Sequence, residues 1–144
     1  MNTTYRITCL LTTLLLPLYA SNSQADHFTR LTAEQLTQLE NHAQPLLVDI
    51  RLPSEWQDTG LLPGSVGLTF FDQQGRYDLN AFKQRLAALR THPDQAVVLL
   101  CRSGRRSAKA VSLLQADRPS DHWYDLEGGL MSLNASSLPG LAHD

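Results

Sequence analysis

With 144 residues, the chain has room for a single domain of ordinary size. Its hydrophobic fraction of 42% and charged fraction of 18% are those of a soluble globular protein and exclude a disordered or fibrous one. A formal net charge of −2 argues against a general binder of nucleic acid or anionic membranes, because such proteins carry a broad positive excess. Two cysteines are too few for a disulfide-rich scaffold or a four-cysteine zinc site.

The N-terminal segment has the pattern of a secretory signal peptide. Arg6 gives it a basic start, residues 7–18 are mostly apolar, and small polar residues follow. The apolar run is too short for a helical membrane span, which needs about 20 residues, and Pro17 interrupts it. We expect cleavage after Ala25, because Ser23 and Ala25 are small residues at the −3 and −1 positions, with Ala20 as a poorer second choice.

Export would change the meaning of the cysteine count. A signal peptide over residues 1–25 predicts a periplasmic protein, or a secreted one, without a membrane anchor after processing. Its removal takes Cys9 away and leaves Cys101 as a single thiol, which is either a small buried hydrophobe or a reactive group. The domain is expected over residues 26–133, and residues 134–144, without clear periodicity, are expected to be loosely held.

Helical periodicity and short apolar runs alternate along this domain. We expect helices over 32–42, 79–89 and 107–116, and strands over 46–50, 66–69, 96–100 and 123–126. This alternation predicts an α/β fold with a mainly parallel sheet. Ligands of such sheets bind outside the carboxyl ends of the strands.

Cys101 lies where that rule places a ligand, because it follows directly at the carboxyl end of the expected strand over 96–100, which is the most apolar of the strands. The loop that follows is polar and leads into a helix, and Gly104 lets it turn tightly. The first N–H groups of a helix have no partners within the helix and point back toward the loop. The result is a concave set of donors suited to an anion.

Three arginines, Arg102, Arg105 and Arg106, crowd this loop. Cations near a helix N-terminus are unfavourable by about 0.3–1 kcal/mol each, so we expect an anion in the same place, a thiolate or an anionic substrate. A cysteine that only packs in a core does not need such a loop. The pattern therefore favours a reactive thiol over a buried structural cysteine.

Three motifs follow one another along the domain. The cysteine loop reads Cys101-Arg-Ser-Gly-Arg-Arg-Ser107, and the upstream motif is Asp49-Ile-Arg51, Glu55-Trp56, Gly60 and Pro63-Gly-Ser65. The downstream motif is Leu126-Glu-Gly-Gly129. Together they resemble the rhodanese family of sulfurtransferases over roughly residues 31–130. Leu61, where the family often has His, and Leu133, near the place of a usual Trp, are departures outside the cysteine loop.

The resemblance implies a rhodanese-like domain with a central, mainly parallel five-stranded sheet flanked by helices. It also implies that Cys101 is the nucleophile, which takes the sulfane sulfur of thiosulfate or another donor as a persulfide and passes it to cyanide or a thiol. Loop N–H groups and arginines would bind the substrate, at Arg102, Ser103, Gly104, Arg105, Arg106 and Ser107. Asp49 and Arg51 would brace the loop or form a fold-supporting ion pair, whereas Glu55, Trp56 and the Gly128–Gly129 turn are interpreted as structural. We expect a monomer that needs no metal and no organic cofactor.

Other functions remain open at this point. A cysteine phosphatase needs an arginine six positions after the cysteine, where this chain has Ser107. Sulfurtransferases that use mercaptopyruvate usually carry a different loop, which favours thiosulfate as the donor. A persulfide carrier or an anion-binding module without significant thiosulfate turnover is the main alternative. A nucleic-acid partner is not expected, because the basic residues are few and local.

Overall fold

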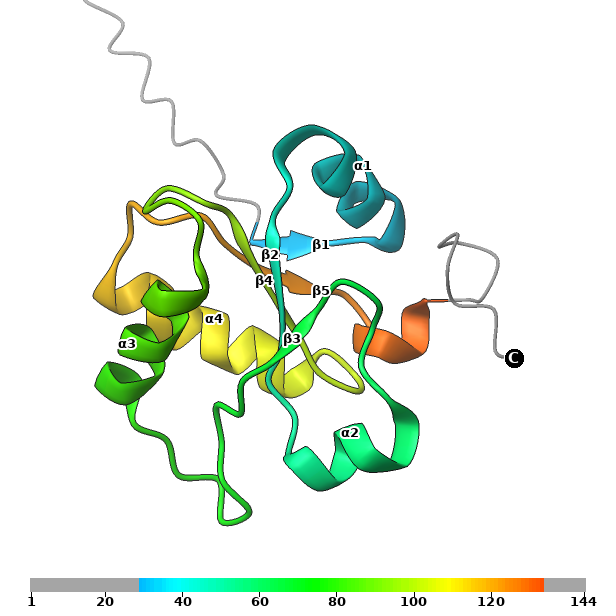
Figure 1. Cartoon of the computed structure of the whole chain (residues 1–144), viewed down its shortest axis with the longest axis vertical. Coiled ribbons are helices and arrows are strands. Elements are labelled where there is room, and N and C mark those ends of the chain that lie inside the picture. Colours follow the sequence, from blue (N-terminus) through cyan, green and yellow to red (C-terminus); the bar gives the residue numbers. More distant parts are fainter. Residues whose placement is uncertain (1–28, 134–144) are drawn as a thin grey trace, which may run out of the picture.

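The computed structural model describes residues 29–133, which form a five-stranded parallel sheet with helices on both faces (Figure 1). The strand order is β1-β5-β4-β2-β3. The strands are β1 (Arg30–Leu31), β2 (Leu46–Asp49), β3 (Val66–Gly67), β4 (Val97–Leu100) and β5 (Trp123–Leu126). The helices are α1 (Ala33–Ala43), α2 (Pro53–Thr59), α3 (Leu79–Leu89), α4 (Arg105–Asp117) and the 3-10 helix η1 (Gly129–Ser132). The predicted α/β fold and five-stranded sheet are confirmed, while the predicted signal peptide and tail lie outside the described residues.

The centre of the sheet sets the position of the cysteine. β4 lies between β5 and β2, and all four of its residues are buried, as expected for a strand covered on both faces. Asp49 of β2 pairs in register with Leu100 of β4, so these two strands end at the same level. Cys101 therefore leaves the sheet beside the end of β2, at the carboxyl edge of the strands.

Helices cover the two faces of the sheet unequally (Figure 1). On one face α3 and α4 bury Phe82, Leu86, Val111 and Leu114 against β2 and β4, in the larger of two apolar clusters. On the other face α1 contributes Leu36 to a smaller cluster. Both clusters include alternate residues of β4, because successive side chains of a strand point to opposite faces.

Three short elements were not predicted. α2 has seven residues and buries none of them completely, so it has no apolar periodicity to detect. β1 is two residues long, and η1 is a single 3-10 turn that includes part of the Gly-Gly motif. α4 also begins at Arg105, two residues before the predicted start, because Gly104 in the left-handed conformation serves as its N-cap.

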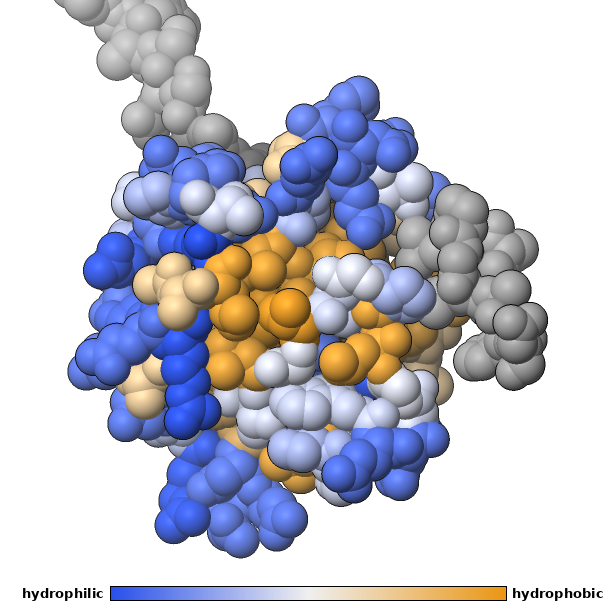
Figure 2. All heavy atoms as spheres, viewed as in Figure 1, coloured by the Kyte–Doolittle hydropathy of each residue, from blue (hydrophilic) through white to orange (hydrophobic). Residues whose placement is uncertain are grey.

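The β2–β3 edge of the sheet has an apolar surface. Figure 2 shows apolar side chains in the middle of this face, within a largely hydrophilic border. The edge strand β3 is only two residues long and leaves Leu46 and Val66 half-buried against the larger cluster. Within residues 29–133, none of the helices combines the length and apolar character needed to cross a membrane.

Candidate active site

Cys101 is held at the start of the loop that connects β4 to α4, as a free thiol that is only 1% exposed. The backbone N–H of Ser107, in the first turn of α4, donates to its Sγ at 3.4 Å. The Ser107 hydroxyl lies at the same distance from Sγ, 3.4 Å, and the side chain of Ser107 is fully buried. The backbone N–H and the hydroxyl of Ser107 therefore both contact the sulfur of Cys101.

The Ser107 hydroxyl suits both protonation states of the sulfur. In the arrangement that the structure records, Ser107 Oγ donates to the carbonyl oxygen of Gly104 at 3.2 Å. It is then free to accept a hydrogen bond from a protonated Cys101. Rotation of the hydroxyl would let it donate to a thiolate instead, together with the Ser107 N–H.

The helix start next to the cysteine depends on Gly104. This glycine has φ +81° and is the N-cap of α4, so the N–H groups of the first helical turn lack partners within the helix and face the loop. A Cβ at Gly104 would lie 3.0 Å from the carbonyl oxygen of Leu126, so the close packing of the two segments also favours glycine.

The Gly128–Gly129 turn packs against this loop. Both glycines have positive φ, at +71° and +60°. The amides that follow donate to the loop itself: Leu130 N–H to the Cys101 carbonyl at 2.9 Å and Met131 N–H to the Arg102 carbonyl at 3.1 Å. A Cβ on Gly129 would overlap the Cys101 carbonyl oxygen and the Gly104 amide nitrogen. The role of the turn is therefore structural, as the sequence suggested: it supports the cysteine loop through backbone hydrogen bonds and close backbone packing.

Arg106 is bound to a carboxylate of the protein itself. Its two terminal nitrogens, Nη1 and Nη2, donate to the two oxygens of Glu55 at 2.7 Å each. Glu55 also accepts from the N–H of Leu52 at the start of α2, at 3.0 Å. The guanidinium of Arg106 lowers the pKa of Glu55 to about 2, and the Glu55 carboxylate in turn raises the pKa of Arg106. We expected a thiolate or a substrate as the anion near this helix start, and Glu55 already provides one.

The other polar side chains of the loop point into solvent. Arg102, Ser103 and Arg105 are exposed, and the structure records no ion pair for either arginine among residues 29–133. In the same part of the chain, no group of three His, Cys, Asp or Glu side chains is arranged to hold a metal ion. The loop thus offers N–H and guanidinium donors, which suit an anion.

Asp49 and Arg51 form a buried ion pair at the end of β2. Arg51 Nη2 lies 2.7 Å from Asp49 Oδ2, and the Arg51 side chain also donates to Thr59 Oγ1 at 2.7 Å and to the Gly60 carbonyl at 2.8 Å. None of the recorded hydrogen bonds of this pair reaches residues 101–107. The pair fixes the C-terminal end of α2 to the sheet, which fits the fold-supporting interpretation.

Glu55 is the residue whose role the sequence did not reveal. We interpreted it as structural, and the structure shows that its structural role is to anchor an arginine of the cysteine loop. Two signals pointed to this role: Pro53 is typical of a helix start near Glu55, and two arginines at the N-terminus of α4 require a compensating anion. Glu55 and Arg106 are 51 positions apart in the chain, so no local sequence pattern indicates their contact.

Comparison with known proteins places the fold and the loop in a family. The family model of the rhodanese-like domain matches residues 32–136. The chain belongs to the rhodanese-like domain family. A rhodanese domain-containing protein of Drosophila melanogaster is 29% identical over 87 residues, which are 59% of this chain and 78% of that protein.

Solved structures share the rhodanese-like fold. A protein of unknown function from Rhodopseudomonas palustris, described as a possible tyrosine phosphatase, is 25% identical with a TM-score of 0.55, over 80% of this chain and 86% of that one. A rhodanese-related protein from Thermoplasma volcanium is 21% identical with a TM-score of 0.55, over 78% of this chain and 96% of that one. At 21% identity, the match to the Thermoplasma volcanium protein supports a shared fold and not a shared activity.

The ion pair between Glu55 and Arg106 predicts a pH-dependent difference in stability. Because the folded pKa of Glu55 is about 2, below its ordinary value of 4.5, its ionised form stabilises the fold above about pH 4.5. This stabilisation is lost as the pH falls toward 2. Glu55→Gln should lower the free energy of unfolding by about 1–2 kcal/mol at pH 7, measured by urea denaturation. The gap to the unmodified protein should shrink between pH 4.5 and 2.

Asp58→Asn is the matched control, because Asp58 is an exposed residue of the same helix with no ion pair recorded among residues 29–133. It should change the stability by less than about 0.5 kcal/mol. If the Glu55→Gln gap stays constant down to pH 2, the charge of Glu55 is not what holds Arg106.

The packing of Gly129 predicts a second effect on stability. Gly129→Ala should destabilise the domain by more than about 2 kcal/mol, because the new methyl group would overlap the backbone of the cysteine loop in addition to straining φ. Gly75→Ala isolates the strain alone, since Gly75 has φ +76° and nothing lies within 4 Å of its Cβ position. Equal losses of stability in the two variants would contradict the proposed close packing.

Proposed function

We propose that the protein is a sulfurtransferase that takes the sulfane sulfur of thiosulfate and carries it as a persulfide on Cys101. Membership of the rhodanese-like family supports sulfurtransferase activity in general. The observation that carries the specific proposal is the contact of the Cys101 sulfur with both the N–H and the hydroxyl of Ser107 at the start of α4. Such donors stabilise a thiolate and, after transfer, a persulfide anion.

The reaction balances without an added oxidant or reductant. The Cys101 thiolate attacks the outer sulfur of thiosulfate, a new S–S bond forms, and the S–S bond of thiosulfate breaks so that its electron pair leaves on sulfite. An acceptor, cyanide or a thiolate, then attacks the outer sulfur of the persulfide. The products are thiocyanate or a new persulfide, together with the regenerated Cys101 thiolate. The second step returns the site to its initial state.

The charges of the loop support an anionic donor. Arg102 and Arg105 are exposed, so their guanidinium groups are free to attract thiosulfate and to bind the sulfite half. Arg106, which the sequence also suggested as a substrate-binding residue, forms an ion pair with Glu55. We therefore assign capture of the dianion to Arg102 and Arg105, and the positioning of the loop to Arg106.

A phosphatase is the alternative that one relative brings into view, because the Rhodopseudomonas palustris protein is described as a possible tyrosine phosphatase. In this chain the sixth position after Cys101 is Ser107, whose buried hydroxyl faces the sulfur. A phosphatase would need an arginine there to clamp the phosphoryl group. The contacts of Ser107 therefore favour sulfur over phosphoryl transfer.

Sulfur transfer to cyanide tests the proposal, with thiosulfate and mercaptopyruvate measured side by side and a phosphate ester as a third substrate. We expect turnover with thiosulfate, none with the ester, and only background in Cys101→Ser. The intact mass after brief exposure to thiosulfate should increase by one sulfur atom in the protein with Cys101 and should not change in Cys101→Ser. Turnover that survives in Cys101→Ser would disprove the mechanism, and the absence of both adduct and turnover would favour a binding module.

We also propose that the protein acts outside the cytoplasm, on the basis of the signal-peptide pattern over residues 1–25. N-terminal sequencing of the protein recovered from a periplasmic extract should give Asp26 as the first residue. A start at Ser21 would support the second cleavage site instead. Recovery of Met1 from that extract would contradict the processing.

A further inference from the structure

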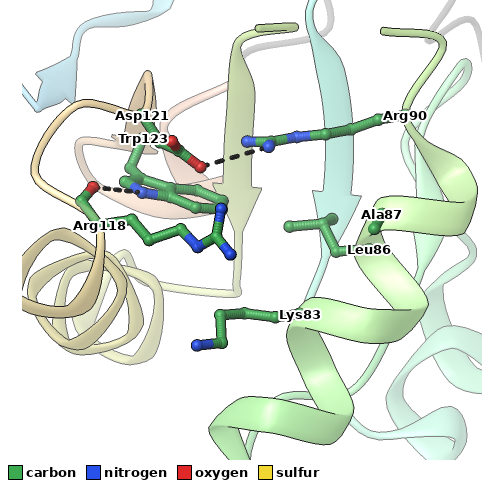
Figure 3. Close-up of a pocket in the computed structure, with 7 residues that line it drawn as sticks. All are labelled: Lys83, Leu86, Ala87, Arg90, Arg118, Asp121 and Trp123. Atoms are coloured by element: carbon green, nitrogen blue, oxygen red, sulfur yellow. Dashed lines mark hydrogen bonds and ion pairs between the residues drawn. The ribbon is translucent and has the colours of Figure 1, made fainter. Parts of the chain in front are cut away.

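A recess lies at the opposite end of the strands from Cys101. It has a volume of about 90 Å³ and is enclosed by α3, the start of β5 and the turn that precedes β5 (Figure 3). Its lining consists of Lys83, Leu86, Ala87, Arg90, Arg118, Asp121 and Trp123. A wider surface hollow of about 430 Å³ adjoins it and shares four of these residues. Because β4 and β5 are parallel and begin at this edge, the recess is separate from the site at their carboxyl ends.

Arg90 is fixed in place at the wall of this recess. Its guanidinium lies 4.7 Å from the centroid of the Trp123 ring. Its Nη1 donates to the carbonyl of Pro93 at 3.0 Å and to Asp121 at 3.3 Å. Its Nε is buried and has no hydrogen-bond partner in the part of the chain that the structure describes. A guanidinium held in this way keeps its orientation before any ligand arrives.

The charges around the recess do not cancel. Lys83 pairs with Asp117 at 2.7 Å, and Arg118 reaches the same carboxylate only at 3.9 Å. Arg90 pairs with Asp121. Within these ion pairs three cations share two carboxylates, which leaves one positive charge in excess at the recess, while Asp94 lines only the adjoining hollow. Figure 3 shows the charged ends of Lys83 and Arg118 directed toward the same space, beside Leu86 and Trp123.

The walls between these charges are apolar. Trp123 and Leu86 are 3% and 1% exposed, so each is fixed in place and presents only a small apolar patch to the recess. The Trp123 indole N–H donates to the Arg118 carbonyl at 3.3 Å, which ties the ring to the residue whose side chain is the most exposed of the three cations. A small volume, one excess positive charge and apolar walls together suit a ligand with a single carboxylate and a short apolar body.

We propose that this recess is a binding site for small monocarboxylates, with Arg118 as the principal partner of the carboxylate and Trp123 with Leu86 as the surface for the apolar part. Arg118 fits this role because a guanidinium can donate two parallel hydrogen bonds to a carboxylate. The site is independent of the sulfur chemistry at Cys101, so its test does not depend on the proposed function.

Propionate is the probe, and the two indole N–H signals of the protein in ¹H–¹⁵N NMR are the readout. The Trp123 signal should shift and saturate as propionate replaces chloride at constant ionic strength, with a dissociation constant in the millimolar range. The Trp56 signal, from α2, should stay in place and serves as an internal control for folding. Propionamide, the neutral analogue of the same shape, should give no saturable shift, and neither should sulfate.

Two variants complete the test. Arg118→Gln should weaken propionate binding about tenfold or more, because it removes a charge-assisted pair, and the side chain is 61% exposed, so the fold should tolerate the change. Arg85→Gln removes an exposed arginine of α3 that does not line the recess and should leave the dissociation constant within about twofold. A Trp123 shift that does not saturate, that propionamide or sulfate reproduces, or that persists in Arg118→Gln would overturn the proposal.

Discussion

Two ion pairs in series hold the cysteine loop in place. The buried pair of Asp49 and Arg51 fastens the end of α2 to β2, through the bonds of Arg51 to Thr59 and Gly60. α2 then presents Glu55, which accepts two hydrogen bonds from Arg106 in the first turn of α4. A charge buried without its partner is strongly unfavourable, so neither end of the first pair can move alone. The position of the α4 start, and with it the donors to Cys101, therefore depends on an interaction at the end of a different strand.

The loop is supported from a second direction by backbone alone. Gly129 packs so closely against Cys101 and Gly104 that no side chain fits, and the amides after it bind the carbonyls of Cys101 and Arg102. One support is electrostatic and reaches the loop from α2, whereas the other is steric and comes from the chain after β5. Between them the sulfur and the Ser107 hydroxyl are fixed, while Arg102 and Arg105 are left in solvent. Such a division suits a site whose nucleophile must be rigid and whose charged rim meets diffusing anions.

The sequence predicted what depends on local pattern. The apolar run before Cys101 and the periodicity of residues 79–89 identified β4 and α3, and the glycine and arginines after Cys101 indicated the anion-binding loop. It did not predict α2, which is too short to have a periodicity, or the contact of Glu55 with Arg106. That contact joins positions far apart in the chain, and no local preference specifies it. The order of the strands likewise rests on long-range pairing and was not predicted, whereas the family resemblance supplied the five-stranded, mainly parallel sheet.

The burial of Cys101 bears on which sulfur of a persulfide an acceptor can reach. A nucleophile can attack either atom of an S–S bond: attack on the outer atom transfers sulfur, whereas attack on the inner atom gives a mixed disulfide and releases sulfide. The cysteine is 1% exposed, and its Sγ lies against Ser107. The outer sulfur extends about 2 Å farther. In the proposed reaction, the fold would therefore favour sulfur transfer over disulfide formation, because it shields the inner atom of the S–S bond and leaves the outer one within reach of the acceptor.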